Sequence, residues 1–463
     1  MSATRSLLAL GTLAMLSAVP AMAQQNAPAR TPDPAAPAAK ADSTVPAKVT
    51  ASMLVPAIEI QHLRPADQRV INVFEAPKAT DVPFTGFKLN WGAAFTQQFQ
   101  ALDHENTAAP RLVGTPAVDR NRLTEIGNGF NTATANLNLN AQLAPGIRVA
   151  LTSYLSSRHH NETWVKDGYL LVDAAPFDFA PLARVMEYVT VKAGHYEINY
   201  GDAHFRRTDN GNAMYNPFVG NLILDAFTTQ IGGEVYVRAR GLMAMGAISG
   251  GEIKGDVSAP SRRSPAFYGK AGLDRQLSPR LRVRLTGSAY GQAKAASQTL
   301  YSGDRAGSRY YSVVDTVGAT LNGAFTSGSL NPGFNKVRAY MVNPFVKYRG
   351  LELFGTLETA KGRMPTETAD RTWTQLAGEA LVRFAPREQL YVGARYNTVE
   401  GRLRGLAQDV GSDRAQLGAG WFITPIVLLK GEYVTQKYSD FPAADWRNGG
   451  KFNGFVVEGV VAF

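Results

Sequence analysis

From Phe87 to the final residue, Phe463, apolar and polar residues alternate in short runs that are separated by turn-forming residues. In residues 133–143, for example, Ala and Leu occupy every odd position, whereas Thr, Asn and Gln occupy the even positions. A period of two predicts a β-strand with one apolar and one polar face. A tilted strand of about 9–11 residues with such faces can cross a lipid bilayer. The pattern therefore predicts an all-β fold, a transmembrane antiparallel β-barrel.

Sixteen segments of the chain show this alternation, and the connections between them differ in length in a regular way. Most connections after even-numbered segments are short, such as Ala144-Pro145-Gly146, whereas those at 103–129, 198–226 and 292–336 are long. Bacterial barrels have short periplasmic turns and long external loops, so this barrel is predicted to begin and end on the periplasmic side. The segments lie near residues 87–102, 130–143, 147–157, 163–174, 188–197, 227–239, 241–250, 265–275, 280–291, 337–348, 350–361, 371–384, 389–398, 412–423, 426–437 and 451–463.

The barrel is predicted to span residues 87–463 and to be closed. An unpaired strand edge is not tolerated in lipid, so the strand that ends at Phe463 is expected to pair with the strand that begins at Phe87. The last strand, with its terminal Phe, is similar to the assembly signal of Gram-negative outer-membrane barrels. That similarity implies the outer membrane as the location, with its lipid and the barrel assembly machinery as partners.

The residues before the barrel predict export and a periplasmic lead-in. A positively charged start, an apolar run and a small-residue cleavage site at Ala23 predict a signal peptide, residues 1–23. Residues 24–50 are rich in Ala and Pro, which predicts a disordered periplasmic segment. Residues 51–86 form a periplasmic pre-barrel segment, and three placements are open for it: inside the barrel as a plug, across its mouth as a cap, or paired beneath it.

The composition fits a barrel and argues against several other classes of protein. Hydrophobic residues make up 45% of the chain, yet the mean hydropathy is only −0.16, as expected when half of each strand faces water. The chain has no Cys, which excludes disulfides and cysteine catalysis. Its net charge of +10 is not concentrated in one basic block. This distribution argues against a nucleic-acid partner and favours a surface or lumen that attracts anions.

The long connection at 198–226 is the candidate for narrowing the barrel. It is rich in Asn, Gly and Tyr, and it contains the adjacent residues Arg206 and Arg207. If the loop folds into the lumen, both guanidinium groups lie at the constriction, where a low dielectric strengthens their attraction for an anion. The alternative is that they pair with Asp202 and Asp209 and only hold the loop together.

Further arginines are predicted on the lumen faces of strands by the same alternation. Three of them occupy every second position of one strand, so their side chains follow one wall in steps of about 6.6 Å. Such a ladder would pass an anion between weak sites. The alternative is that lumen carboxylates neutralise these arginines; the candidates are Glu352, Glu358, Glu432 and Glu458. The predicted lumen arginines are Arg148, Arg280, Arg282, Arg284, Arg338 and Arg395.

Two stretches resemble the phosphate-selective porin O/P family of outer-membrane proteins. They are residues 167–173 (DGYLLVD) and 189–201 (VTVKAGHYEINYG), in which Gly194-His195-Tyr196-Glu197 and Tyr200-Gly201 match the outline of a strand that precedes an inward-folded loop. The resemblance implies a sixteen-stranded, arginine-lined channel that assembles as a homotrimer. Together with the lumen arginines, it predicts a porin, a water-filled diffusion channel for small anionic solutes.

Two other functions are open. A surface hydrolase would need an exposed His near the rim, and His159 and His160, beside Glu162, are the candidates. The chain contains no G-x-S-x-G, H-E-x-x-H or P-loop spacing, so no catalytic residue, metal site or cofactor is predicted. An adhesin or structural barrel would contact its partners through the loops 292–336 and 103–129. A TonB-type transporter would need a folded plug and roughly 22 strands, more than this chain can supply.

Overall fold

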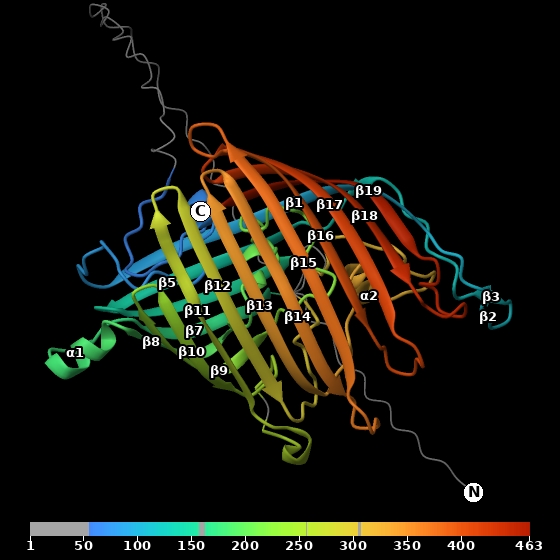
Figure 1. Ribbon diagram of the computed structural model, residues 1–463, viewed down its shortest axis with the longest axis horizontal. Coiled ribbons are helices and arrows are strands. Elements are labelled where there is room, and N and C mark those ends of the chain that lie inside the picture. Colours follow the sequence, from blue (N-terminus) through green and yellow to red (C-terminus); the bar gives the residue numbers. More distant parts are fainter. Residues whose placement is uncertain (1–54, 157–162, 256, 304–306) are drawn as a thin grey trace, which may run out of the picture. The chain divides into compact units, whose positions relative to one another are not determined.

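The computed structural model describes residues 55–156, 163–255, 257–303 and 307–463, and its main feature is a closed antiparallel barrel of sixteen strands (Figure 1). The predicted signal peptide and Ala/Pro-rich segment lie outside these residues. The helices are α1 (Ala180–Met186) and α2 (Leu321–Thr326), with the short 3₁₀ helices η2 (Gln68–Val70), η4 (Ala203–Arg206) and η5 (Pro260–Arg262). The strands are β1 (Lys88–Glu105), β2 (Leu112–Val113), β3 (Val118–Asp119), β4 (Gly129–Phe130), β5 (Thr134–Ala144), β6 (Ile147–Ser156), β7 (Thr163–Val172), β8 (Val189–Glu197), β9 (Thr229–Ala239), β10 (Leu242–Ser249), β11 (Ala266–Ser278), β12 (Leu281–Gln292), β13 (Lys336–Tyr348), β14 (Leu351–Arg363), β15 (Arg371–Phe384), β16 (Leu390–Gly401), β17 (Val410–Thr424), β18 (Val427–Ser439) and β19 (Lys451–Ala462).

The barrel consists of β1 and β5 to β19, and each of the sixteen predicted segments overlaps one of these strands. The second predicted segment, 130–143, began too early. The chain forms the separate short strand β4 beside β1 and enters the barrel only at Thr134, the start of β5. The short strands β2 and β3 pair with each other outside the barrel wall.

The barrel closes between its first and last strands, as predicted. β1 pairs antiparallel with β19, in a register that places Phe95 opposite Val461. The backbone of Phe463 exchanges two hydrogen bonds of 3.0 Å with Ala93, which ends the seam. A Cβ atom at Gly92 would lie 2.8 Å from the carbonyl oxygen of Phe463, so the seam requires glycine there.

The two faces of the wall have opposite chemistry. On β1, Trp91, Phe95 and Phe99 are exposed on the outside, whereas Gln98 and Gln100 are buried on the inside. This arrangement places apolar side chains toward lipid and polar side chains in the lumen. No helix among the described residues has both the length and the apolar character needed to cross a membrane.

The connections at one end of the barrel, the end predicted to face the periplasm, are mostly tight hairpins. Between β9 and β10, Arg240 and Gly241 both adopt positive φ values, 51° and 78°, which is the geometry of a two-residue type I′ turn. The connection between β7 and β8 differs, because it contains helix α1 and leaves Phe177 and Phe179 exposed. Short turns therefore follow every even-numbered barrel strand except the fourth.

Candidate functional site

The connection between β8 and β9, residues 198–228, lies inside the barrel, as the sequence predicted for the loop at 198–226. The backbone N–H of Asp202 donates to Asn343 of β13 at 2.7 Å. The N–H of Gly211 donates to Asn136 of β5 at 2.9 Å. β5 and β13 are eight strands apart in both directions around the ring. The loop therefore crosses the lumen from one wall to the opposite wall.

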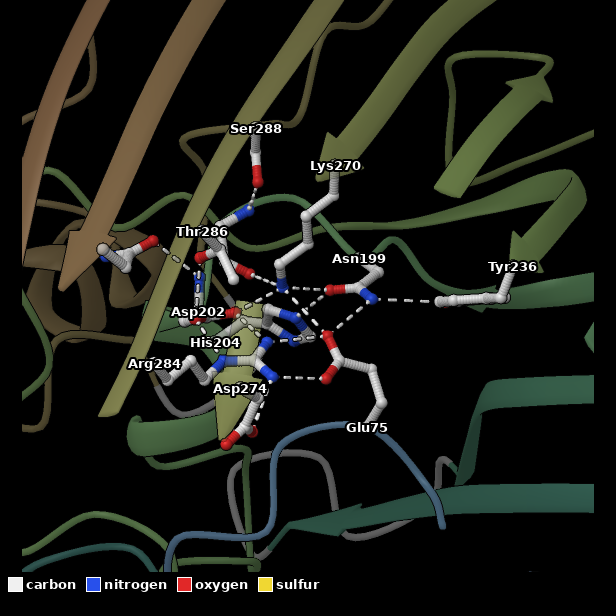
Figure 2. Close-up of polar contacts among 12 residues, drawn as sticks. Glu75, Asn199, Asp202, His204, Tyr236, Lys270, Asp274, Arg284, Thr286 and Ser288 are labelled. Atoms are coloured by element: carbon white, nitrogen blue, oxygen red, sulfur yellow. Dashed lines mark hydrogen bonds and ion pairs between the residues drawn. The ribbon is translucent and has the colours of Figure 1, made fainter. Parts of the chain in front are cut away.

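Arg284 of β12 belongs to an ion cluster that joins this loop to the wall (Figure 2). The guanidinium of Arg284 lies 2.8 Å from Asp202 of the loop and 2.9 Å from Glu75 of the pre-barrel segment. Lys270 of β11 lies 2.5 Å from Asp202 and 3.2 Å from Glu75. Arg282 pairs with Asp274 at 2.6 Å. The predicted alternative, neutralisation of the ladder by carboxylates, therefore holds on this wall, although none of the four carboxylates named from the sequence takes part.

The cations of the cluster keep the carboxylates of Glu75 and Asp202 ionised. Burial alone would raise the pKa of Glu75, but Lys270 and Arg284 outweigh it and hold that pKa well below its usual range. The same two cations lower the pKa of Asp202 against its complete burial. A buried cluster of this kind is favourable because each charge has both an opposite charge and hydrogen bonds.

The predicted constriction arginines of the loop are also paired. Arg206 lies 3.0 Å from Glu379 of β15, and Arg207 lies 2.6 Å from Asp225 at the far end of the same loop. Arg395 of β16 shares Glu379 at 2.8 Å. These partners are not the ones considered from the sequence, because the fold brings carboxylates from distant strands and from the end of the loop.

Two predicted lumen arginines lie elsewhere. Arg280 is exposed in the short turn between β11 and β12, just before β12 begins. Arg338 is exposed on the outer face of β13, because Val337 and Ala339 point inward. Both faces of that strand carry apolar residues, among them Val342 on the outside, so hydrophobicity did not fix the inward face. The lumen placement of these two arginines was wrong.

Arg148, the remaining predicted arginine, lines a cavity of about 290 Å³ inside the barrel. The loop, the pre-barrel segment and the inner faces of β5 to β9 enclose this space. Arg64 of the pre-barrel segment and Arg238 of β9 line the same cavity. Neither was among the predicted site residues. Arg238 is the last but one residue of a predicted strand, and nothing in the sequence placed Arg64 inside the barrel.

These three arginines are bound by neutral groups. Arg148 donates to Asn140 at 2.7 Å, and Arg238 donates to the carbonyl oxygen of Ala76 at 2.6 Å. Arg64 donates to the carbonyl of Val73 at 2.9 Å. Within the described residues, none of the three forms an ion pair with a carboxylate. Each also has one buried guanidinium nitrogen without a hydrogen-bond partner among the described atoms, namely Nη2 of Arg64, Nε of Arg148 and Nε of Arg238.

The pre-barrel segment lies at the end of the barrel with the short turns and reaches several parts of the wall. The side chain of Gln61 accepts from the N–H of Gly146 in the turn between β5 and β6, at 3.0 Å. The N–H of Gln68 donates to the carbonyl of Pro425 in the turn between β17 and β18, at 2.8 Å. Arg282 of β12 donates to the carbonyl of Asn72 at 2.8 Å. Contacts with three separate parts of the ring place residues 55–86 across the mouth of the barrel at the short-turn end, which is predicted to be the periplasmic mouth.

No group of His, Asp or Glu side chains with metal-binding geometry occurs among the described residues. His159 and His160, the candidates for a hydrolase, lie outside those residues. His204 of the loop, in contrast, is buried and bonded to Asn199 at 3.0 Å, so it belongs to the packing of the lumen.

Comparison of the sequence with known protein families and with curated proteins finds no match. Among solved structures, the barrel is similar to OmpT, an outer membrane protein of Vibrio cholerae, at 10% identity and a TM-score of 0.48, over 83% of this chain and 100% of that one. The anion-selective porin from Comamonas acidovorans gives 12% identity and a TM-score of 0.47 over 81% and 100% of the two chains. The outer membrane channel DcaP of Acinetobacter baumannii gives 9% and 0.49 over 82% and 98%. Similarity at this level carries no information on function, and membership of the porin O/P family stays a prediction.

Proposed function

We propose that the protein is a porin of the Gram-negative outer membrane, a diffusion channel for small anionic solutes. The observation that carries this proposal is the loop 198–228, which crosses a polar lumen from β13 to β5 inside a barrel with an apolar exterior. The loop narrows the lumen together with residues of the connection between β12 and β13, to which it is bonded: Asn221 donates to the carbonyl of Ser308 at 3.2 Å and Phe227 to that of Leu300 at 2.9 Å. The cavity beside β5 to β9 is a space that these connections leave. A narrowed polar lumen selects solutes by size and charge.

The arginines support the anionic part of the proposal. Those of β12, the loop and β16 are neutralised by carboxylates, so they shape the lumen and add little attraction for a passing ion. Arg148 and its two neighbours in the cavity keep their charge without a carboxylate partner. A cation held in a narrow, partly desolvated passage attracts anions more strongly than one at an open surface.

The pre-barrel segment is part of the proposed channel. Its position across the periplasmic mouth means that a solute leaving the cavity passes beside residues 55–86. We propose that this segment sets the conductance from the periplasmic side, as the loop 198–228 does from the middle of the lumen.

Conductance in planar lipid bilayers tests the proposal. The full chain, folded in detergent and added to the bilayer, is expected to give discrete current steps, and the reversal potential in a salt gradient is expected to show anion preference. A folded barrel that inserts without current would overturn the channel and favour an adhesin or structural barrel. Current with cation preference would overturn the anionic part alone. Cross-linking in the same detergent tests the predicted homotrimer.

A further inference from the structure

We infer that Arg64, Arg148 and Arg238 form a binding site for a small anion with a carboxylate or phosphate group. The site deepens the proposed function, because it would be the place in the channel where a solute pauses. It lies near the periplasmic end, since Arg148 is the second residue of β6 and Arg238 is the last but one of β9.

The pre-barrel segment contacts Arg148 and Arg238 and supplies Arg64, and all three arginines line the same cavity. The carbonyl of His62 lies 3.5 Å from Nη2 of Arg148, and the ring of His62 contacts the carbonyl of Pro77 at 3.1 Å. Pro77 follows Ala76, whose carbonyl accepts from Arg238. Arg64 is two residues beyond His62 in the chain. The site therefore combines charges from β6, β9 and the segment that covers the mouth.

The unpartnered nitrogens show that each of these guanidinium groups can donate a further hydrogen bond to a ligand. A buried N–H without an acceptor costs free energy, and charged groups cost more than neutral ones. Three such groups line one cavity, whereas the neighbouring cations Lys166 and Lys192 pair with carboxylates at 2.6 Å and 3.4 Å. The planar guanidinium matches the geometry of carboxylate and phosphate oxygens, so an oxyanion would satisfy these donors directly.

The charges in the cavity are separated along the wall. Asp167, Glu197 and Asp209 gather around Lys166. In the register of β6 and β7, Arg148 is opposite Leu171, four residues beyond Asp167, which corresponds to about 13 Å along a strand. At the arginine end, Asp173 lines the cavity and is held by Thr190 at 2.8 Å. The other carboxylates that line the cavity are in ion pairs: Asp67 with Arg69, Glu75 with Arg284, and Asp167, Glu197 and Asp209 with Lys166. Among the described lining residues, Asp173 is therefore the one carboxylate outside an ion pair, against three arginines outside one.

The size and lining of the cavity set the class of ligand. A volume of about 290 Å³ is at the lower end of the roughly 300–1,000 Å³ that is usual for ligand pockets. Arg64 lies 4.4 Å from the ring centroid of Tyr215 and 5.2 Å from that of Phe205, so apolar surface adjoins the charge. The site therefore fits a small oxyanion, with room beside it for a short apolar body.

Titration calorimetry of the full chain in detergent micelles tests the site, with inorganic phosphate and benzoate as probes. We expect at least one probe to bind, and the stronger one identifies whether the apolar body contributes. Arg148→Gln and Arg238→Gln are each expected to weaken binding roughly tenfold or more, because each removes charged hydrogen bonds. Arg148→Lys keeps the charge and is expected to bind between wild type and Arg148→Gln. Arg338→Gln, on the outer face of β13, is the matched control and is expected to bind as wild type does.

Thermal unfolding and conductance measurements separate a loss of the binding site from a loss of the fold or of the channel. Because each of these arginines has an unpartnered nitrogen, the Gln variants are expected to unfold at or above the wild-type temperature without ligand. The site is overturned if neither probe binds, or if the Gln variants bind as the Arg338→Gln control does. If the barrel conducts ions but binds neither probe, the channel stands and the site fails. If it binds a probe but passes no current, the site stands and the channel fails.

Discussion

The two sides of the lumen use the same residue in opposite ways. On β12, Arg284 is paired with Asp202, Asp274 and Glu75, and these carboxylates neutralise its charge. On β6, Arg148 has the same orientation into the lumen, yet its hydrogen bonds go to an amide and a carbonyl oxygen. An inward arginine is therefore not in itself an anion site. Its role depends on whether a second segment supplies a carboxylate.

The partners that decide between these roles come from far away in the chain. Asp202 and Glu75 are separated from Arg284 by 82 and 209 residues, in the inward loop and in the pre-barrel segment. The pre-barrel segment also faces the wall of β5 to β9, where it presents the carbonyls of His62 and Ala76 instead. The arginines of β12 are thus neutralised, whereas Arg148 and Arg238 have no carboxylate partner among the described residues.

The largest expected effect is the loss of stability when the neutralised wall is broken. Arg284→Ala removes a partner from the buried carboxylates Asp202 and Glu75 and is expected to lower the free energy of unfolding by about 3–5 kcal/mol, because a buried charge is left under-compensated. Arg148→Ala leaves no carboxylate unpaired, so its cost is expected to stay within about 1 kcal/mol. Urea unfolding in detergent, followed by tryptophan fluorescence, measures both.

Equal losses of unfolding free energy for Arg284→Ala and Arg148→Ala would show that arginine stabilises both walls. That result would contradict the difference between the two walls. Arg338→Ala controls for loss of an arginine from a barrel strand. It lies on the outer face, so it is expected to change the free energy of unfolding by less than either lumen variant.

The next effect is on conductance. Deletion of residues 55–86 removes the segment from the periplasmic mouth and is expected to give the greatest increase in single-channel current of any variant described here. It also removes Arg64, so anion preference is expected to fall at the same time. Bilayer recordings measure both. Unchanged current would show that the segment does not obstruct the path, and that the connections inside the lumen limit flow.

Anion preference should depend on Arg148, on the wall of β5 to β9, more than on the neutralised arginines of β12. Removing a unit charge about 4 Å from the ion path changes an ion's energy by about 1 kcal/mol in water-like surroundings, which is roughly a fivefold change in preference. Arg148→Ala is expected to approach that size in the reversal potential. Arg282→Ala is expected to change it less, because Asp274 already cancels that charge. A larger effect at Arg282 would reverse the assignment of the two walls.

The sequence was sufficient for the barrel, because strand alternation and turn length are local properties that each segment carries by itself. It predicted the sixteen strands, the closure at Phe463 and the inward loop. It could not find the ion pairs, because each depends on which distant segment faces the arginine in the folded lumen. Arg338 shows a second limit: where both faces of a strand are apolar, the alternation does not reveal which face is inside.

The smallest expected effect is that of pH on the ion cluster, and it separates the cluster from the anion site. Burial acts to raise the folded-state pKa of Glu75, but Lys270 and Arg284 act against it more strongly, so the pKa is lowered overall. A lowered pKa means that the stabilising contact is complete above the unfolded value, about 4.3, and is lost only as pH falls through the lower, folded value. The wild-type current is therefore expected to stay constant from pH 8 down to about pH 5.

Glu75→Gln is neutral at every pH, and this makes it the sharper test of the same contact. It is expected to weaken the attachment of the pre-barrel segment and to raise the current slightly at all pH values, by less than deletion of residues 55–86 does. Under strongly acidic conditions the wild-type current is expected to rise, because protonation of Glu75 weakens this contact. The current of Glu75→Gln is expected to show no additional change there. Anion preference should remain, because Arg148 and Arg238 are attached to β6 and β9 and do not depend on Glu75. A loss of preference in Glu75→Gln would mean that the two walls are coupled through the segment.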